Sequence, residues 1–139
     1  MAIFLNNKVG FKLNTVDLSD HVTAFTLNRQ ADQLEVTAMG DTAHKFVTGL
    51  SADTITVSFL NDTAAASVLA TIQAAFGTTV AFSAIQDKVA VVSATNKLYT
   101  GTLLVDNVTD IAGAVADEAM IDITFTCNST TALATTGTF

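Results

Sequence analysis

The chain has 139 residues, half of them hydrophobic and only 14% charged, with a formal net charge of −7. This length is typical of one domain that buries its own core, and the apolar content excludes a disordered chain. The six basic residues are scattered singly, whereas binding to nucleic acid needs clustered Lys and Arg that displace counterions from the phosphates. The scatter and the negative net charge argue against binding to nucleic acid and to anionic membranes.

No apolar run approaches the ~20 residues that span a bilayer, and the first seven residues are too short for a signal peptide. We therefore expect synthesis and folding in a cytoplasm, without membrane association. Proline is absent and no composition shift marks a domain boundary, so residues 1–139 are interpreted as one domain. A surface with so few charges tolerates burial against neighbours, which favours a packed assembly.

The first half of the chain predicts two strands and a projecting hairpin. Residues 9–13 alternate as a short strand, and residues 21–28 form a second strand with apolar area on both faces. Residues 29–49 are a partly polar excursion in which Leu34 and Val36 precede a turn at Met39–Asp41, before Lys45–Val47 returns antiparallel. Such a hairpin has little core to pack against within one subunit.

Residues 53–77 predict a strand followed by the single helix. Ile55, Val57 and Phe59 alternate with polar residues, and the period then changes to 3.6. Asn61 or Asp62 is the expected N-cap, and Gly77 is placed where a C-terminal glycine is preferred. The stripe expected to face the core comprises Val68, Leu69, Ile72 and Phe76.

Strands are then predicted over residues 79–85, 89–93, 98–105 and 120–127. A Ser/Thr/Ala-rich C-terminal tail, residues 128–139, is interpreted as frayed or ordered on a neighbouring subunit. Several strands with one mid-chain helix and no βαβ alternation predict a mostly β fold. The expected architecture is an antiparallel β-sandwich or barrel with one flanking α-helix.

No combination of side chains predicts catalysis, a metal site or a cofactor. Asp20 with His21 and Asp41 with His44 are candidate acid/base or metal-binding pairs, but two distant histidines and one cysteine are too few ligands for a structural metal. Ser19, Asp20 and His21 adjoin in sequence, which is not how a triad is built. We expect His21 to face solvent and His44 to lie in the hairpin.

Other polar or reactive residues have structural interpretations. Cys127 falls on the apolar face of a strand and is expected to be an inert, buried thiol. Gly40 is assigned to a turn and Gly101 to a close backbone approach within a strand. An acidic cluster around a predicted loop has spacing too irregular for Ca²⁺ and is interpreted as a solvated rim. It comprises Asp106, Asp110, Asp117 and Glu118.

Several segments, taken in order, resemble the tail tube (major tail) proteins of long-tailed bacteriophages. They are Val16-Asp-Leu-Ser-Asp-His-Val-Thr-Ala-Phe-Thr-Leu-Asn28, Thr37-Ala-Met-Gly-Asp-Thr42, Val92-Ser-Ala-Thr-Asn96, Tyr99-Thr-Gly-Thr-Leu-Leu-Val105 and Gly113-Ala-Val-Ala-Asp-Glu-Ala-Met-Ile-Asp-Ile-Thr-Phe125. The likeness covers most of the chain, from about residue 9 to residue 127. The chain departs from the family in lacking prolines near Asn96 and in residues 106–113, and in having Ala116 where glycine is usual.

The resemblance implies a structural virion protein, not an enzyme, located in the phage tail. Its subunits would form stacked homohexameric rings that make a hollow conduit for DNA. The implied partners are further copies of the chain and other tail proteins, namely the tape measure, terminator and distal tail proteins. DNA would be passing cargo and not a specific ligand.

Two alternatives stay open. A neck, connector or head-decoration virion protein could use the same sandwich in a single ring or on a shell. A small binding module or hydrolase on a β-sandwich would need a concave pocket with convergent polar groups, which the sequence does not specify.

Overall fold

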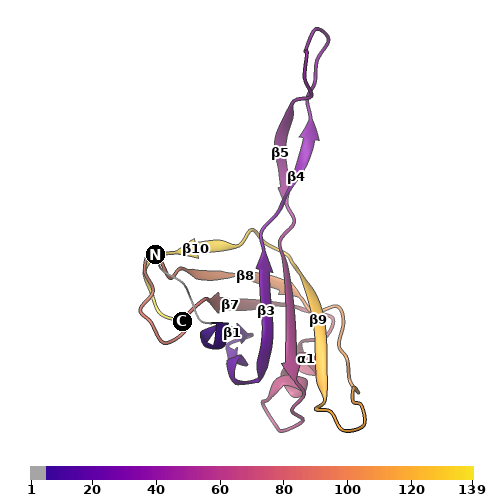
Figure 1. The fold of residues 1–139 in the computed structure, drawn as a ribbon, viewed down its shortest axis with the longest axis vertical. Helices are drawn as coiled ribbons and strands as arrows, with labels where there is room; N and C mark the ends of the chain where they lie inside the picture. Colours follow the sequence, from indigo (N-terminus) through magenta and orange to yellow (C-terminus); the bar gives the residue numbers. More distant parts are fainter. Residues whose placement is uncertain (1–5) are drawn as a thin grey trace.

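The computed structural model describes residues 6–139, which form an antiparallel β-fold with one α-helix (Figure 1). The fold class expected from the sequence is therefore confirmed. Two short 3₁₀ helices cover Asn6–Lys8 and Ser19–His21. The strands are β1 (Gly10–Leu13), β2 (Val16–Asp17), β3 (Val22–Asn28), β4 (Ala31–Glu35), β5 (Phe46–Ser51), β6 (Thr54–Leu60), β7 (Thr79–Ile85), β8 (Leu98–Leu104), β9 (Met120–Cys127) and β10 (Ala132–Ala134), and the helix is α1 (Val68–Ala75).

Eight strands form one sheet in the order β2-β1-β7-β8-β9-β6-β3, with β10 paired to β8. β8 meets β9 through only two residue pairs, Leu103 with Cys127 and Leu104 with Thr126. The sheet turns at this narrow junction, so that β3, β6 and β9 cross the direction of β7 and β8 (Figure 1). The result is two layers of strands packed nearly orthogonally.

Aromatic side chains close the sandwich between distant strands of the sheet. The ring centroid of Phe11 on β1 lies 5.1 Å from the ring centroid of Phe25 on β3 and 6.3 Å from that of Phe59 on β6. β6 and β9 bury every second residue in this core, as the strand period of two requires. The largest fully buried side chains are Phe11, Phe59, Phe125, Leu13, Leu18, Ile55, Ile72, Leu103, Ile121, Ile123, Val57 and Val68.

The helix begins later than predicted. Neither Asn61 nor Asp62 is its N-cap, because the Asp62 carboxylate accepts the Ala64 N–H and makes a separate turn. Ala66 then has φ = +61°, a left-handed conformation that cannot belong to a right-handed helix. Gly77 does follow the helix as expected, with φ = +79°. Of the predicted stripe, Val68, Leu69 and Ile72 are buried, whereas Phe76 is 53% exposed.

The strand predicted over residues 89–93 is wrong, because a buried asparagine organises this segment as a loop. The Asn96 amide accepts the Asp87 N–H and donates to the carbonyls of Asp87, Ala90 and Val91. The loop backbone thus finds its partners without a neighbouring strand. Among the other predicted strands, residues 79–85 and 120–127 have the observed bounds of β7 and β9.

The C-terminal tail is also corrected, since residues 128–139 are ordered on their own subunit. β10 pairs with β8, and Thr131 is buried. Phe139 joins a second apolar cluster with Ile85 and Val92, and its ring occupies the space that a Cβ at Gly10 would need. The tail contains few apolar residues, but the pairing of β10 with β8 and a hydrogen bond from the Thr131 N–H to the buried Asp53 carboxylate keep it on the body.

Candidate assembly interface

The predicted hairpin projects from the body as a separate two-stranded sheet of β4 and β5 (Figure 1). We call residues 31–51 the arm; the sequence placed it at about 29–49. Leu34 pairs with Val47 and Glu35 with Phe46. At the tip, Gly40 has φ = +94° and the Asp41 carboxylate accepts the Ala38 N–H, which confirms the predicted turn.

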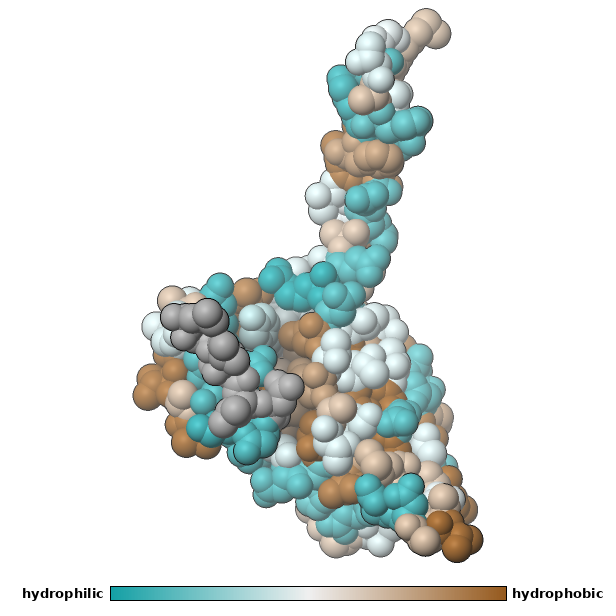
Figure 2. Space-filling model, in the orientation of Figure 1, coloured by the Kyte–Doolittle hydropathy of each residue, from teal (hydrophilic) through white to brown (hydrophobic). Residues whose placement is uncertain are grey.

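The arm carries exposed apolar side chains on both of its faces. Cross-strand partners lie on the same face, so Leu34 and Val47 share one face and Phe46 lies on the other. Their exposed fractions are 54%, 47% and 53%. Figure 2 shows an apolar band across this slender arm, between hydrophilic stretches. Val36, Met39 and Leu50 are exposed as well.

A single buried carboxylate fastens the base of the arm to the tail. Asp53 is 3% exposed, and its two oxygens accept the N–H groups of Gln30 (3.1 Å) and Thr131 (2.9 Å). Burial alone would raise the pKa of Asp53, but these bonds and nearby Arg29 outweigh burial and lower it. A hydrogen bond of 3.0 Å between the hydroxyls of Ser51 and Thr130 adds a second link.

The histidines and their neighbours form separate pairs and no common site. His21 is partly buried rather than solvent-facing, because its Nε2 lies 3.0 Å from the Asp62 carboxylate. His44 lies in the arm as expected, 3.2 Å from Glu35. The aspartates considered as partners of these histidines form ion pairs with lysines instead: Asp20 pairs with Lys88 and Asp41 with Lys45.

Ser19 and Cys127 are held in structural roles. The Ser19 hydroxyl accepts the Phe11 N–H and donates to Asp17, so it is committed to joining β1 and β2. Cys127 is partly buried at the β8–β9 junction; burial raises the pKa of its thiol, and the nearby Asp53 carboxylate raises it further. A thiol with a raised pKa is a poor nucleophile at neutral pH.

The long β8–β9 connection, residues 105–119, carries the acidic cluster on its surface. Asp106, Asp110, Asp117 and Glu118 are all exposed, as a solvated rim requires. No group of His, Cys, Asp or Glu within residues 6–139 has the geometry of a metal site. Ile111 and Val115, in the same connection, are 94% and 100% exposed. This end of the molecule therefore also presents apolar side chains to solvent.

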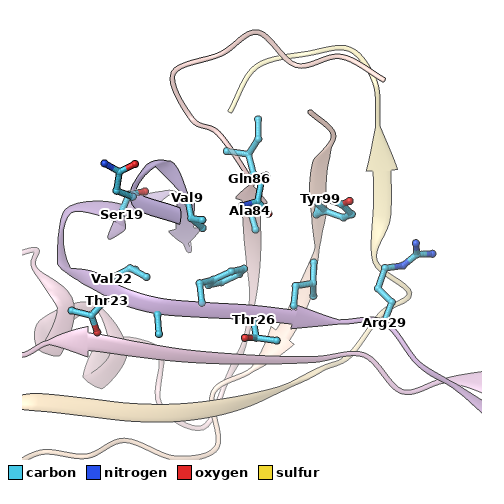
Figure 3. A pocket seen from close by; sticks show the side chains of 14 residues that line it. Val9, Ser19, Val22, Thr23, Thr26, Arg29, Ala84, Gln86 and Tyr99 are labelled. Atoms are coloured by element: carbon cyan, nitrogen blue, oxygen red, sulfur yellow. The ribbon is translucent and has the colours of Figure 1, made fainter. Parts of the chain in front are cut away.

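A groove that sequence reasoning missed runs along β3, which is an edge strand of the sheet (Figure 3). Its volume is about 610 Å³. In Figure 3, Val22 on β3 points toward Val9, and Ala84 and Tyr99 lie farther along the opposite wall of the groove, whereas Thr23 and Thr26 point away. The alternation within residues 21–28 could have indicated a half-covered strand, but not that its outer edge stays open.

No protein-family model matches this sequence, and no curated protein is similar to it. Within residues 6–139, no helix has the length and apolar character needed to cross a bilayer. Three surfaces of the fold remain as candidates for a function: the arm, residues 105–119 and the groove beside β3.

Proposed function

We propose that this protein is a structural subunit that assembles with copies of itself into a hollow tube, as the tail tube protein of a long-tailed bacteriophage. The observation that carries this proposal is the arm. It exposes Leu34, Val47 and Phe46 on two opposite faces, beyond the reach of the core. A concentration of exposed apolar side chains on one projecting segment is typical of an interaction site.

The placement of the exposed surfaces supports stacking. The arm extends from one end of the molecule, and residues 105–119 descend toward the opposite end (Figure 1). Contacts between unlike surfaces at opposite ends are heterologous, and they generate rings or open-ended stacks instead of closed pairs. Such a subunit is suited to a tube built from stacked rings, for which the sequence resemblance implies six subunits per ring.

The charge of the chain supports a conduit through which DNA passes. Each copy has a formal net charge of −7. Because DNA is itself densely charged, acidic groups near the lumen would repel it and prevent adhesion. Screening over about 8–10 Å at ordinary salt limits this repulsion to groups close to the DNA. In this proposal the protein resides in the virion, DNA is cargo, and other tail proteins bind the ends of the tube.

The second virion candidate, a neck, connector or head-decoration protein, would use the same body in one ring or on a shell. This candidate differs from a tube subunit in one testable property: its rings would not stack on one another. A surface at each end of the subunit favours the tube, since a single ring leaves both ends uncovered.

The arm is tested by replacing Phe46 and Leu50 together with serine. Both side chains are exposed, so folding should be unaffected, with a melting temperature within a few degrees of wild type. Assembly, followed by sedimentation velocity, should fall at least tenfold. The matched control is the replacement of Val89 and Val91, which are similarly exposed but lie outside the arm. Equal assembly by wild type and the arm variant would contradict the proposal.

A further inference from the structure

We propose that the arm of one copy docks in the β3 groove of a second copy and adds a strand to the open edge of β3. This inference rests on the proposed self-assembly and names the surface that receives the arm. Six of the seven residues of β3, Val22 to Leu27, line the groove, and so does Arg29. The opposite wall of the groove includes Val9, Ala84 and Tyr99.

Both surfaces have backbone groups that lack a partner strand. β3 ends the sheet and pairs only with β6 among the described strands, and β4 and β5 pair only with each other. An exposed strand edge is a template for another strand, and strand addition is a common mode of recognition. The lengths are compatible, since β5 spans about 20 Å and β3 about 23 Å at the usual rise per residue.

The side chains and charges are complementary. Phe46, on one face of the arm, would meet the apolar wall formed by Phe25, Ala84 and Tyr99, whereas Val47, on the opposite face, would lie beside Ala24 of β3. Among residues 6–139, Arg29 is the only charged side chain that lines the groove; it lies near Asp53 but forms no ion pair with a described residue. The arm has three carboxylates against one lysine, so its net charge is negative.

The arm that fills the groove must come from another copy. β3 continues through Arg29 and Gln30 directly into β4, and the arm then extends away from the body (Figure 1). The backbone N–H of Gln30 is held by Asp53, and the N–H of Ala52 bonds to the Gln30 carbonyl at 2.6 Å. These bonds fix the direction in which the arm leaves, so it does not fold back along its own β3.

Disulfide trapping between two variants tests this contact. Cys127 is the only cysteine, so a Cys127→Ser background is free of thiols. One variant carries Val47→Cys in the arm and the other Ala24→Cys on β3, on the face opposite Phe25; they are mixed, assembled and oxidised. The matched control replaces the groove variant with Ala81→Cys, an exposed β7 alanine outside the groove. We expect cross-linked dimers at least fivefold more abundant with Ala24→Cys than with Ala81→Cys.

Assembled material in which the two pairs cross-link equally would overturn the docking surface while leaving the tube proposal intact. Failure of wild-type protein to assemble at all would instead overturn the proposed function. If the cysteine variants do not assemble, amide hydrogen exchange measured on the wild-type protein tests the docking surface instead. Docking predicts that amides of β3 exchange at least fivefold more slowly in the assembly than in the monomer, and unchanged exchange contradicts it.

Discussion

Asp53 shows how one residue can join segments that are far apart in the sequence. Its carboxylate bonds to the N–H groups before β4 and before β10, and its own carbonyl accepts the Cys127 N–H. A buried carboxylate with two charge-assisted hydrogen bonds is strongly held, and removing its charge leaves two donors poorly satisfied. The base of the arm and the tail are thus stabilised by the same group.

The Asp53→Asn variant should lower the free energy of unfolding at pH 7 by about 1–3 kcal/mol. Because the pKa of Asp53 is lowered in the folded state, its contribution is complete above the unfolded pKa and is lost as pH falls through the folded pKa. The difference between wild type and variant should therefore narrow below about pH 4. Denaturant unfolding across pH measures this, and a pH-independent difference would refute the role of the charge.

At the scale of elements, the tail and the arm depart from simple patterns in opposite ways. The tail resembles a frayed end in sequence, yet it adds a strand to β8 and buries Thr131. The arm contains good strand residues, yet it leaves them exposed. In both cases, whether the segment packs on the body depends on tertiary strand pairing, which cannot be predicted from composition.

Removal of residues 129–139 should impair folding itself, not only stacking. The truncation deletes β10, leaves Asp53 without the Thr131 N–H and uncovers Ile85 and Leu98. We expect the free energy of unfolding to fall by about 3 kcal/mol or more. The control, removal of residues 136–139, loses the Phe139 contacts but keeps β10 and should cost less. Thermal unfolding by circular dichroism measures both, and wild-type stability of the longer truncation would contradict this role.

Local pattern predicted the body of the fold well. Ile55, Val57 and Phe59 alternate as a half-buried strand must, and all three are fully buried. The helix start failed because Ala66 adopts a left-handed φ, which nothing in its side chain indicates. Ala116 likewise has φ = +64°, and its side chain again gives no indication of this conformation.

The interface was only partly predictable for a physical reason. The arm is a local hairpin, so its turn and alternation can be found in one stretch of sequence. The groove joins β3 to β7 and β8 across the sandwich, and it exists because β3 is left at the end of the sheet. Strand order depends on long-range pairing, so no single segment contains that information.

At the scale of the whole molecule, no described residue outside them covers the arm, residues 105–119 or the outer edge of β3, whereas the body has its own core. We propose that copies of the chain cover these three surfaces. Electron microscopy of the purified protein, over a range of salt and protein concentrations, tests this most directly. We expect hollow tubes with six-fold symmetry in end views and regularly stacked rings in side views. Monomers under every condition, or single rings that never stack, would contradict it.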